Sequence, residues 1–160
     1  MKTYCILFVI KLATRSVTIA SITTSLNTAL LLQVARQLTD DFDGFLSNSK
    51  YLIMDRDKKY SREFRRQLKR DGVRSIRCPP RAPNCNAFAE RFVRSVKEEC
   101  LGRLILFSEH SLRHAVKEYM IHYHTERNHQ GMNNQLLRPL ASVSTLDPIR
   151  SHERLAGMLK

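Results

Sequence analysis

Apolar positions along the chain form short runs that suit strands and spaced stripes that suit helices. Residues 4–10 are a continuous β-prone run, and residues 16–22 alternate between apolar and polar positions. The short polar stretch between these two segments predicts an antiparallel hairpin. A further apolar run at residues 51–54 predicts a buried strand that ends at Asp55, and residues 73–77 predict one more strand.

Four helices are predicted from apolar residues at helical spacing. Each is preceded or opened by a polar residue that suits an N-terminal cap: Asn27, Ser61, Asn86 and Ser108. Pro79, Pro80 and Pro83 force an extended loop before the third helix. The order of the elements indicates an α/β fold with a mixed sheet and flanking helices.

Positive charge is concentrated in one part of the chain. The 160 residues include 27 Lys and Arg against 15 Asp and Glu, a formal net charge of +12. Residues 56–103 hold 15 of the basic residues and 6 of the acidic ones. A strongly basic domain favours a polyanionic partner, and the alternative is a generally basic, soluble surface. The concentration of the charge favours the binding surface.

The remaining composition excludes several classes of protein. A hydrophobic fraction of 42%, with 5 Gly and 5 Pro, excludes disordered and collagen-like chains. No apolar stretch reaches the roughly 18 residues of a membrane helix, so no membrane partner is expected. The 4 Cys lack CxxC spacing and indicate reduced thiols in a cytoplasmic protein. His110 and His114 have the i, i+4 spacing of zinc ligands, but no third ligand accompanies them.

Two carboxylates are candidates for catalysis. Asp55 directly follows a buried strand, where α/β sheets place groups that handle ligands. Glu90 lies in the first turns of the third predicted helix. Two such carboxylates brought together can hold Mg²⁺, and metal ions stabilise in-line attack on a phosphodiester. The alternative is structural, with Asp55 in a turn and Glu90 favourable to the helix dipole.

Three segments of the chain stand out as a set: Asp55–Tyr60 (DRDKKY), Pro79–Phe92 (PPRAPNCNAFAERF) and His122–Gly131 (HYHTERNHQG). Together they resemble the motifs of the integrase-type DDE transposases of bacterial insertion sequences. The first resembles the second-acid motif of that family, the second resembles the third-acid motif, and the third resembles the segment that closes the catalytic domain. The resemblance implies a catalytic core over residues 1–140, followed by a C-terminal tail at residues 141–160.

The family implies an RNase H-like fold, like the catalytic core of retroviral integrases. Its activity is metal-dependent DNA strand cleavage and strand transfer, which serve DNA integration. By this resemblance Asp55 and Glu90 are catalytic residues that bind Mg²⁺ or Mn²⁺. The implied partners are transposon ends and target DNA, bound by a homo-oligomer in the bacterial cytoplasm, at the nucleoid.

Basic residues close to the two acids in the sequence are candidates for DNA contacts. Arg94 and Lys97 are the best of them, because they follow Glu90 by four and seven positions and share its helix face. The alternative for this pair is a solvated helix face that forms ion pairs with Glu98 or Glu99. The other candidates are Arg91, Lys58, Lys59 and Arg81.

The first acid of the family and the central strand that carries it are expected to be missing. The chain opens at what corresponds to the family's second strand, and no acid precedes Asp40. Asp40, Asp41 and Asp43 follow the first helix and are interpreted as helix-end and loop residues. We therefore expect impaired catalysis, and the alternative is a non-catalytic DNA-binding remnant of a transposase. A nucleic-acid-binding module of another fold is a third possibility, but no RNP, KH or zinc-finger pattern is present.

Overall fold

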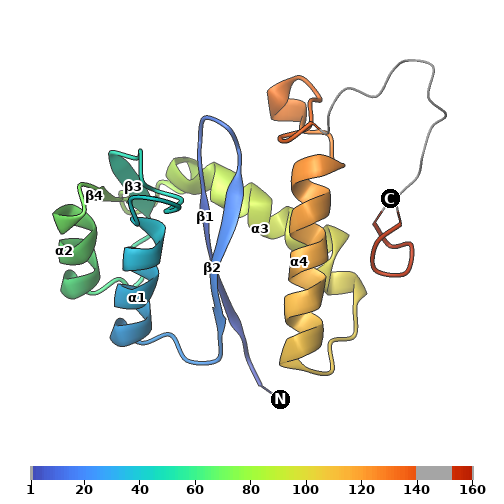
Figure 1. Ribbon diagram of the computed structural model, residues 1–160, viewed down its shortest axis with the longest axis horizontal. Helices are drawn as coiled ribbons and strands as arrows, with labels where there is room; N and C mark the ends of the chain where they lie inside the picture. The colour runs from blue at the N-terminus through green and yellow to red at the C-terminus, as the bar shows by residue number, and fades with distance from the viewer. Residues whose placement is uncertain (1, 140–152, 160) are drawn as a thin grey trace. The chain divides into compact units, whose positions relative to one another are not determined.

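The computed structural model describes residues 2–139 and 153–159 (Figure 1). The chain divides into two compact units. Unit 1 comprises Met1–Val9 and Thr18–Ala89, and unit 2 comprises Ile10–Val17 and Glu90–Lys160. Within the described ranges, none of the helices combines the length and the apolar character needed to cross a bilayer.

The strands and helices follow the order predicted from the sequence. They are β1 (Cys5–Ile10), β2 (Val17–Thr23), α1 (Thr28–Leu38), β3 (Tyr51–Met54), α2 (Arg62–Arg70), β4 (Arg74–Arg77), α3 (Ala87–Glu99) and α4 (Glu109–Thr125). Short 3-10 turns lie at Pro83–Asn86, Leu101–Arg103 and Gln130–Met132. The sequence did not predict these turns, and the first of them continues directly into α3.

Strands β1 and β2 form the predicted hairpin. They pair as a two-stranded sheet, and the Lys11 N–H donates to the Ser16 carbonyl at 2.9 Å to close the turn. A connection as short as this permits only antiparallel pairing.

Strands β3 and β4 pair in parallel through the crossover helix α2. The register places Tyr51 opposite Arg74 and Ile53 opposite Ile76. One face of this pair carries Met54, which is buried in the core of unit 1. The other face is exposed, with Ile53 at 39% and Ile76 at 45% of their full accessible surface.

The α/β class is confirmed, but the described strands do not form the single mixed sheet that was expected. They form two separate two-stranded sheets, β1–β2 and β3–β4. Each pair is joined by its own connection, a hairpin turn or a crossover helix. Among the described residues, no strand of one pair is hydrogen-bonded to a strand of the other pair, so the two sheets are separate.

The core of unit 1 is built from the apolar faces of α1 and α2. From α1 it takes Leu31, Val34, Ala35 and Leu38, and from α2 it takes Phe64 and Leu68. The predicted caps are confirmed: the Asn27 side chain accepts from the Leu30 N–H at 2.9 Å, and Ser61 accepts from the Phe64 N–H at 3.2 Å. Thr39 Oγ1 donates to Asp71 Oδ2 at 2.8 Å and joins the ends of the two helices.

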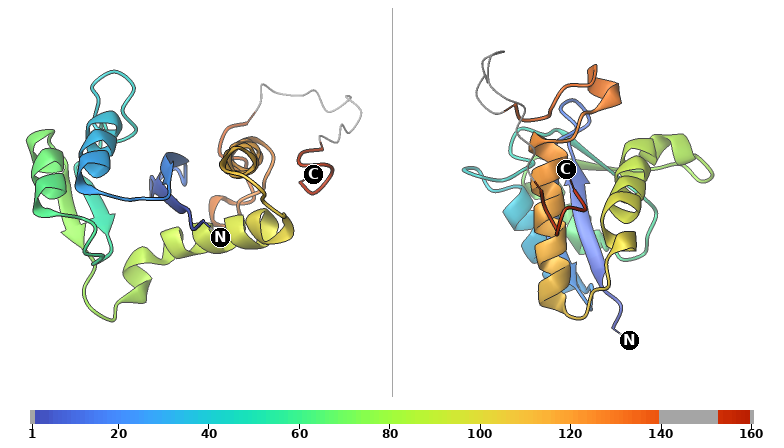
Figure 2. Two further views of the ribbon diagram at one scale, coloured as in Figure 1. Left: turned by 90° about the horizontal axis from the view of Figure 1, so that it is seen from below. Right: turned by 90° about the vertical axis from the view of Figure 1, so that its right-hand side faces the viewer.

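The core of unit 2 lies between α3 and α4, which cross one another in Figure 2. The ring centroids of Phe92 and Tyr123 lie 5.2 Å apart in an edge-to-face arrangement. The ring centroids of Phe92 and Tyr119 lie 6.4 Å apart. Ser108 caps α4 in a reciprocal capping box with Ser111. The predicted apolar stripe of α3 is only partly buried, since Phe88 is 40% exposed.

The predicted C-terminal tail lies mostly outside the described residues. Residues 153–159 are described, and a short antiparallel bridge joins Arg154 to Leu159. Arg154 also bonds Glu118 and Glu126 of unit 2, so this part is attached to α4 and its C-terminal end.

Candidate functional site

Asp55 lies in a tight turn directly after β3. Its side chain is exposed, and Oδ1 accepts a hydrogen bond from the Asp57 N–H at 3.1 Å. This is the turn geometry that the structural alternative expects. Oδ2 accepts no hydrogen bond from any described residue, so the same carboxylate keeps an oxygen that could bind a cation.

Local bonds connect the residues of the turn that holds Asp55. Asp57 Oδ1 accepts from the Lys59 N–H at 3.0 Å, and Asp57 Oδ2 pairs with Lys59 Nζ at 3.1 Å. These bonds, first of all the one from the Lys59 N–H, lower the pKa of Asp57. Arg56 Nε donates to the Cys78 carbonyl at 2.9 Å, which ties the turn to the residue after β4. No role was predicted for Arg56, because its partner lies 22 positions away and local spacing does not indicate it.

Glu90 is exposed in the first turn of α3. In the part of the chain that the structure describes, its carboxylate forms neither a hydrogen bond nor an ion pair. A free carboxylate at this position suits the helix dipole, and it is equally available to a cation.

The two candidate carboxylates fall in different units. Asp55 belongs to unit 1, and Glu90 is the first residue of the second segment of unit 2. Their convergence on one Mg²⁺ or Mn²⁺ therefore stays a prediction. Their chemistry fits such an ion, because each offers exposed carboxylate oxygen. Among the described residues, no group of three or more His, Cys, Asp or Glu side chains could hold a metal ion.

The basic residues of α3 are available for a ligand. Arg91, Arg94 and Lys97 are all exposed. Neither Arg94 nor Lys97 forms an ion pair with another described residue. Glu99, one of their two alternative partners, is bonded to Arg127 instead.

The basic candidates of unit 1 differ in their surroundings. Lys58 and Arg81 are exposed, and Arg81 has a left-handed backbone with φ of 57°. Lys59 is also exposed but pairs with Asp57, which raises the pKa of Lys59. Lys59 must give up this pair to bind a phosphate, so it is the weakest of the three candidates.

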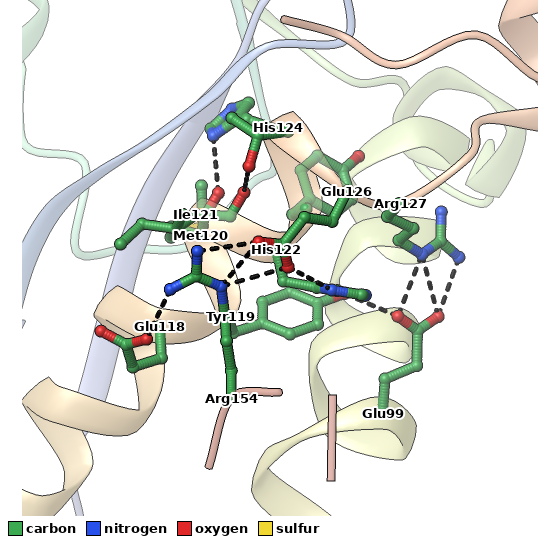
Figure 3. Close-up of polar contacts among 12 residues, drawn as sticks. Glu99, Glu118, Tyr119, Met120, Ile121, His122, His124, Glu126, Arg127 and Arg154 are labelled. Atoms are coloured by element: carbon green, nitrogen blue, oxygen red, sulfur yellow. Dashed lines mark hydrogen bonds and ion pairs between the residues drawn. The ribbon is translucent and has the colours of Figure 1, made fainter. Parts of the chain in front are cut away.

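The segment that closes the predicted core is held by a bidentate ion pair (Figure 3). Arg127 Nη2 donates to Glu99 Oε1 at 2.8 Å, and Arg127 Nε donates to Oε2 at 3.0 Å. Tyr119 Oη donates to the same carboxylate at 3.3 Å. Burial, followed by the Glu99 charge, raises the pKa of Tyr119. The family-like motif contains Arg127, but its partner lies 28 positions earlier and could not be predicted from spacing.

A second polar network joins α4 to residues 153–159. Arg154 Nε donates to Glu126 Oε1 at 2.9 Å, and Arg154 Nη1 donates to Glu118 Oε2 at 2.9 Å (Figure 3). His122 Nδ1 lies 3.1 Å from Glu126 Oε2. The bonds from Arg154 are the main reason why the pKa of Glu126 is lowered.

Two histidines of the closing segment form hydrogen bonds to the backbone of unit 2. His124 Nδ1 donates to the Met120 carbonyl at 2.8 Å, and Nε2 accepts from the Val17 N–H at 3.1 Å. These two bonds require the neutral imidazole. His129 Nε2 donates to the Tyr123 carbonyl at 2.7 Å. Burial lowers the pKa of both histidines.

Lowering the pH from 7 to 5 is expected to reduce the free energy of unfolding. The pKa values of His124 and His129 are lower in the folded chain, so the unfolded chain takes up protons first as the pH falls through about 6.5. The stability that the two histidines contribute is therefore complete above this pH and is lost below it. Thermal unfolding followed by circular dichroism at pH 7, 6 and 5 measures the effect.

A His124→Gln variant isolates one of the two groups. It loses the fixed ring that accepts from the buried Val17 N–H, which costs about 1–3 kcal/mol at pH 7. The free energy of unfolding of this variant should also fall less steeply with decreasing pH than that of the wild-type chain. His110→Gln, at an exposed position of the same helix, is the matched control. An identical pH response in the His124 variant and the wild type would contradict the assignment.

No curated protein matches the chain. The family described as integrase core domain matches residues 71–136, which run from the end of α2 through α3 and α4. This stretch holds Glu90 and the closing segment, while Asp55 lies before it. The match confirms the resemblance, and residues 71–136 are integrase-core sequence of the integrase and transposase type.

Proposed function

We propose that this chain acts in DNA integration or transposition, as an RNase H-like catalytic core of an integrase-type transposase. The observation that carries the proposal is the integrase-core match across α3, the helix that presents Glu90. The same helix presents Arg94 and Lys97, both exposed and without an ion pair among the described residues. One helix thus combines an acid with two cations that can hold the DNA backbone.

Asp55 and Glu90 are the proposed metal ligands. Both carboxylates are exposed, and each has oxygen atoms without a hydrogen-bond donor among the described residues. Bound Mg²⁺ or Mn²⁺ supplies the charge that stabilises in-line attack on a phosphodiester. The role of this chain's residues is to hold that charge and, through Arg94, Lys97 and Arg91, to position the phosphate backbone. The proposed partners are transposon ends and target DNA, and the active form is a homo-oligomer associated with the nucleoid.

The second candidate function is a non-catalytic DNA-binding remnant of a transposase. It is favoured by the exposed cations of α3, which can hold a DNA backbone without a metal ion. Both functions require DNA binding, and only the first requires metal-dependent strand transfer that disappears when Glu90 is replaced.

DNA binding is expected to weaken when the cations of α3 are removed. An Arg94→Ala, Lys97→Ala double variant should bind a labelled 30-base-pair duplex about tenfold more weakly at ~0.1 M salt. The slope of log affinity against log salt should fall by about 2, since each lost phosphate contact accounts for about 0.9. Fluorescence anisotropy across a salt series measures both quantities.

The matched control is an Arg36→Ala, Lys117→Ala double variant. It removes the same charge from exposed positions of α1 and α4 outside the proposed surfaces. If the affinity of the wild-type chain for the duplex does not change with salt, the DNA-binding proposal is wrong. If the two double variants lose equal affinity, the effect is one of net charge and not of the α3 surface.

A further inference from the structure

One face of α2 is strongly basic. Its cations recur at intervals of three, one and three positions and so share one side of the helix: Arg62, Arg65, Arg66 and Lys69. Phe64 and Leu68, between them, point into the core of unit 1 and are buried. The burial of these two residues fixes the orientation of the helix and turns the basic face toward solvent.

The basic face borders a hollow that is open to solvent. Its volume is about 560 Å³, and its lining residues are Arg62, Arg65, Arg66, Lys69, Arg74 and Ser75. Arg74 and Ser75 come from β4, so two elements contribute. The lining carries five cations and no acid. We call this feature the basic hollow.

The charges of the basic hollow are not neutralised by the protein. None of its five cations forms an ion pair with another described residue, and Arg65 Nε donates only to the Ser61 carbonyl, at 3.3 Å. Glu63 lies on the same helix, but it is exposed, and its pKa is lowered first by a bond to its own backbone N–H. The charges of Arg66 and Arg62 lower the pKa of Glu63 less than its hydrogen bonds do. Unpaired like charges in one hollow favour the binding of an anion.

We propose that the basic hollow binds the phosphodiester backbone of DNA, as a contact surface additional to Arg94 and Lys97. Four of the five cations are Arg, whose planar fork suits phosphate oxygens. A single phosphate carries about two negative charges, which is too few for five cations on two elements, whereas a nucleic-acid backbone supplies a row of charges. That the backbone belongs to DNA rests on the proposed function.

The test uses an Arg66→Ala, Lys69→Ala double variant of the full chain. Both side chains are exposed, and Ala preserves the helix. Binding to the labelled 30-base-pair duplex should weaken about tenfold, and the salt slope should fall by about 2. The Arg36→Ala, Lys117→Ala variant serves again as the charge-matched control. Inorganic tripolyphosphate, added at the phosphate concentration of the duplex, should displace the duplex far less effectively than unlabelled duplex does.

The binding experiment would overturn the proposal through an unchanged salt slope in the variant, an equal loss in the control, or displacement by tripolyphosphate as effective as by DNA. A measurement on the wild-type chain guards against misfolding of the variant. DNA should slow the labelling of Lys69 by an amine-reactive reagent, read by mass spectrometry, with Lys117 as the internal control. Equal rates with and without DNA would also reject the proposal. If only the Arg94, Lys97 variant loses affinity for DNA, the proposed function is retained and only the DNA contact at the basic hollow is rejected.

Discussion

Replacing Glu90 with Gln is expected to abolish strand transfer that depends on Mg²⁺ or Mn²⁺, with a loss of at least about 100-fold. The amide keeps the size of the side chain but removes the charge that would hold the cation. Glu90 is exposed, so the free energy of unfolding should stay within about 0.5 kcal/mol of the wild-type value. The loss would thus report on chemistry and not on folding.

The measurement is the joining of a labelled transposon-end oligonucleotide to a target duplex, with Mn²⁺ included because activity is expected to be low. Glu98→Gln is the matched control, since Glu98 is an exposed acid on the same helix. Activity retained in the Glu90 variant would contradict its role as a metal ligand. If the wild-type chain binds DNA but shows no metal-dependent joining, the second candidate function, a non-catalytic DNA-binding remnant of a transposase, is supported and the catalytic one is rejected.

Replacing Phe92 with Ala is expected to cost about 3–5 kcal/mol of unfolding free energy. Phe92 is 3% exposed, and its ring contacts both Tyr123 and Tyr119 of α4. The substitution removes these aromatic contacts and leaves a cavity that the two helices can fill only in part. Urea unfolding followed by tyrosine fluorescence is suitable, because the chain has 5 Tyr and no Trp.

Phe88→Ala is the matched control for this experiment. It removes the same ring from the same helix at a position that is 40% exposed, so the expected loss is about 1 kcal/mol or less. A loss below about 1 kcal/mol for Phe92→Ala would show that this ring does not hold α3 against α4. A loss as large for Phe88 as for Phe92 would assign the stability to the whole apolar side of α3.

Local signals in the sequence were sufficient for most elements of the fold. Asn27, Ser61 and Ser108 cap helices where they were predicted to, because a cap depends on residues only three positions away. The separation into two sheets was not predictable in this way. Strand pairing depends on which edges meet in space, and the apolar pattern of a strand carries no information on its partner.

The same distinction applies to the candidate site. Motif resemblance located Asp55 and Glu90, and the structure leaves both exposed, but the sequence could not say whether they meet. The bond from Arg127 to Glu99 joins residues 28 positions apart, and the spacing of charges does not reveal it. The charge of residues 56–103 as a whole does not reveal the basic face of α2. Its signal, cations at three- and four-residue intervals, was already present in the sequence.

The exposed face of the β3–β4 pair will shape how this protein behaves during purification. A net charge of +12 keeps the molecules apart at low ionic strength, while Ile53 and Ile76 offer an apolar surface on a short, open sheet. Salt screens the repulsion but does not weaken apolar attraction. A high-salt wash is therefore the step at which precipitation should begin, and low protein concentration is the remedy.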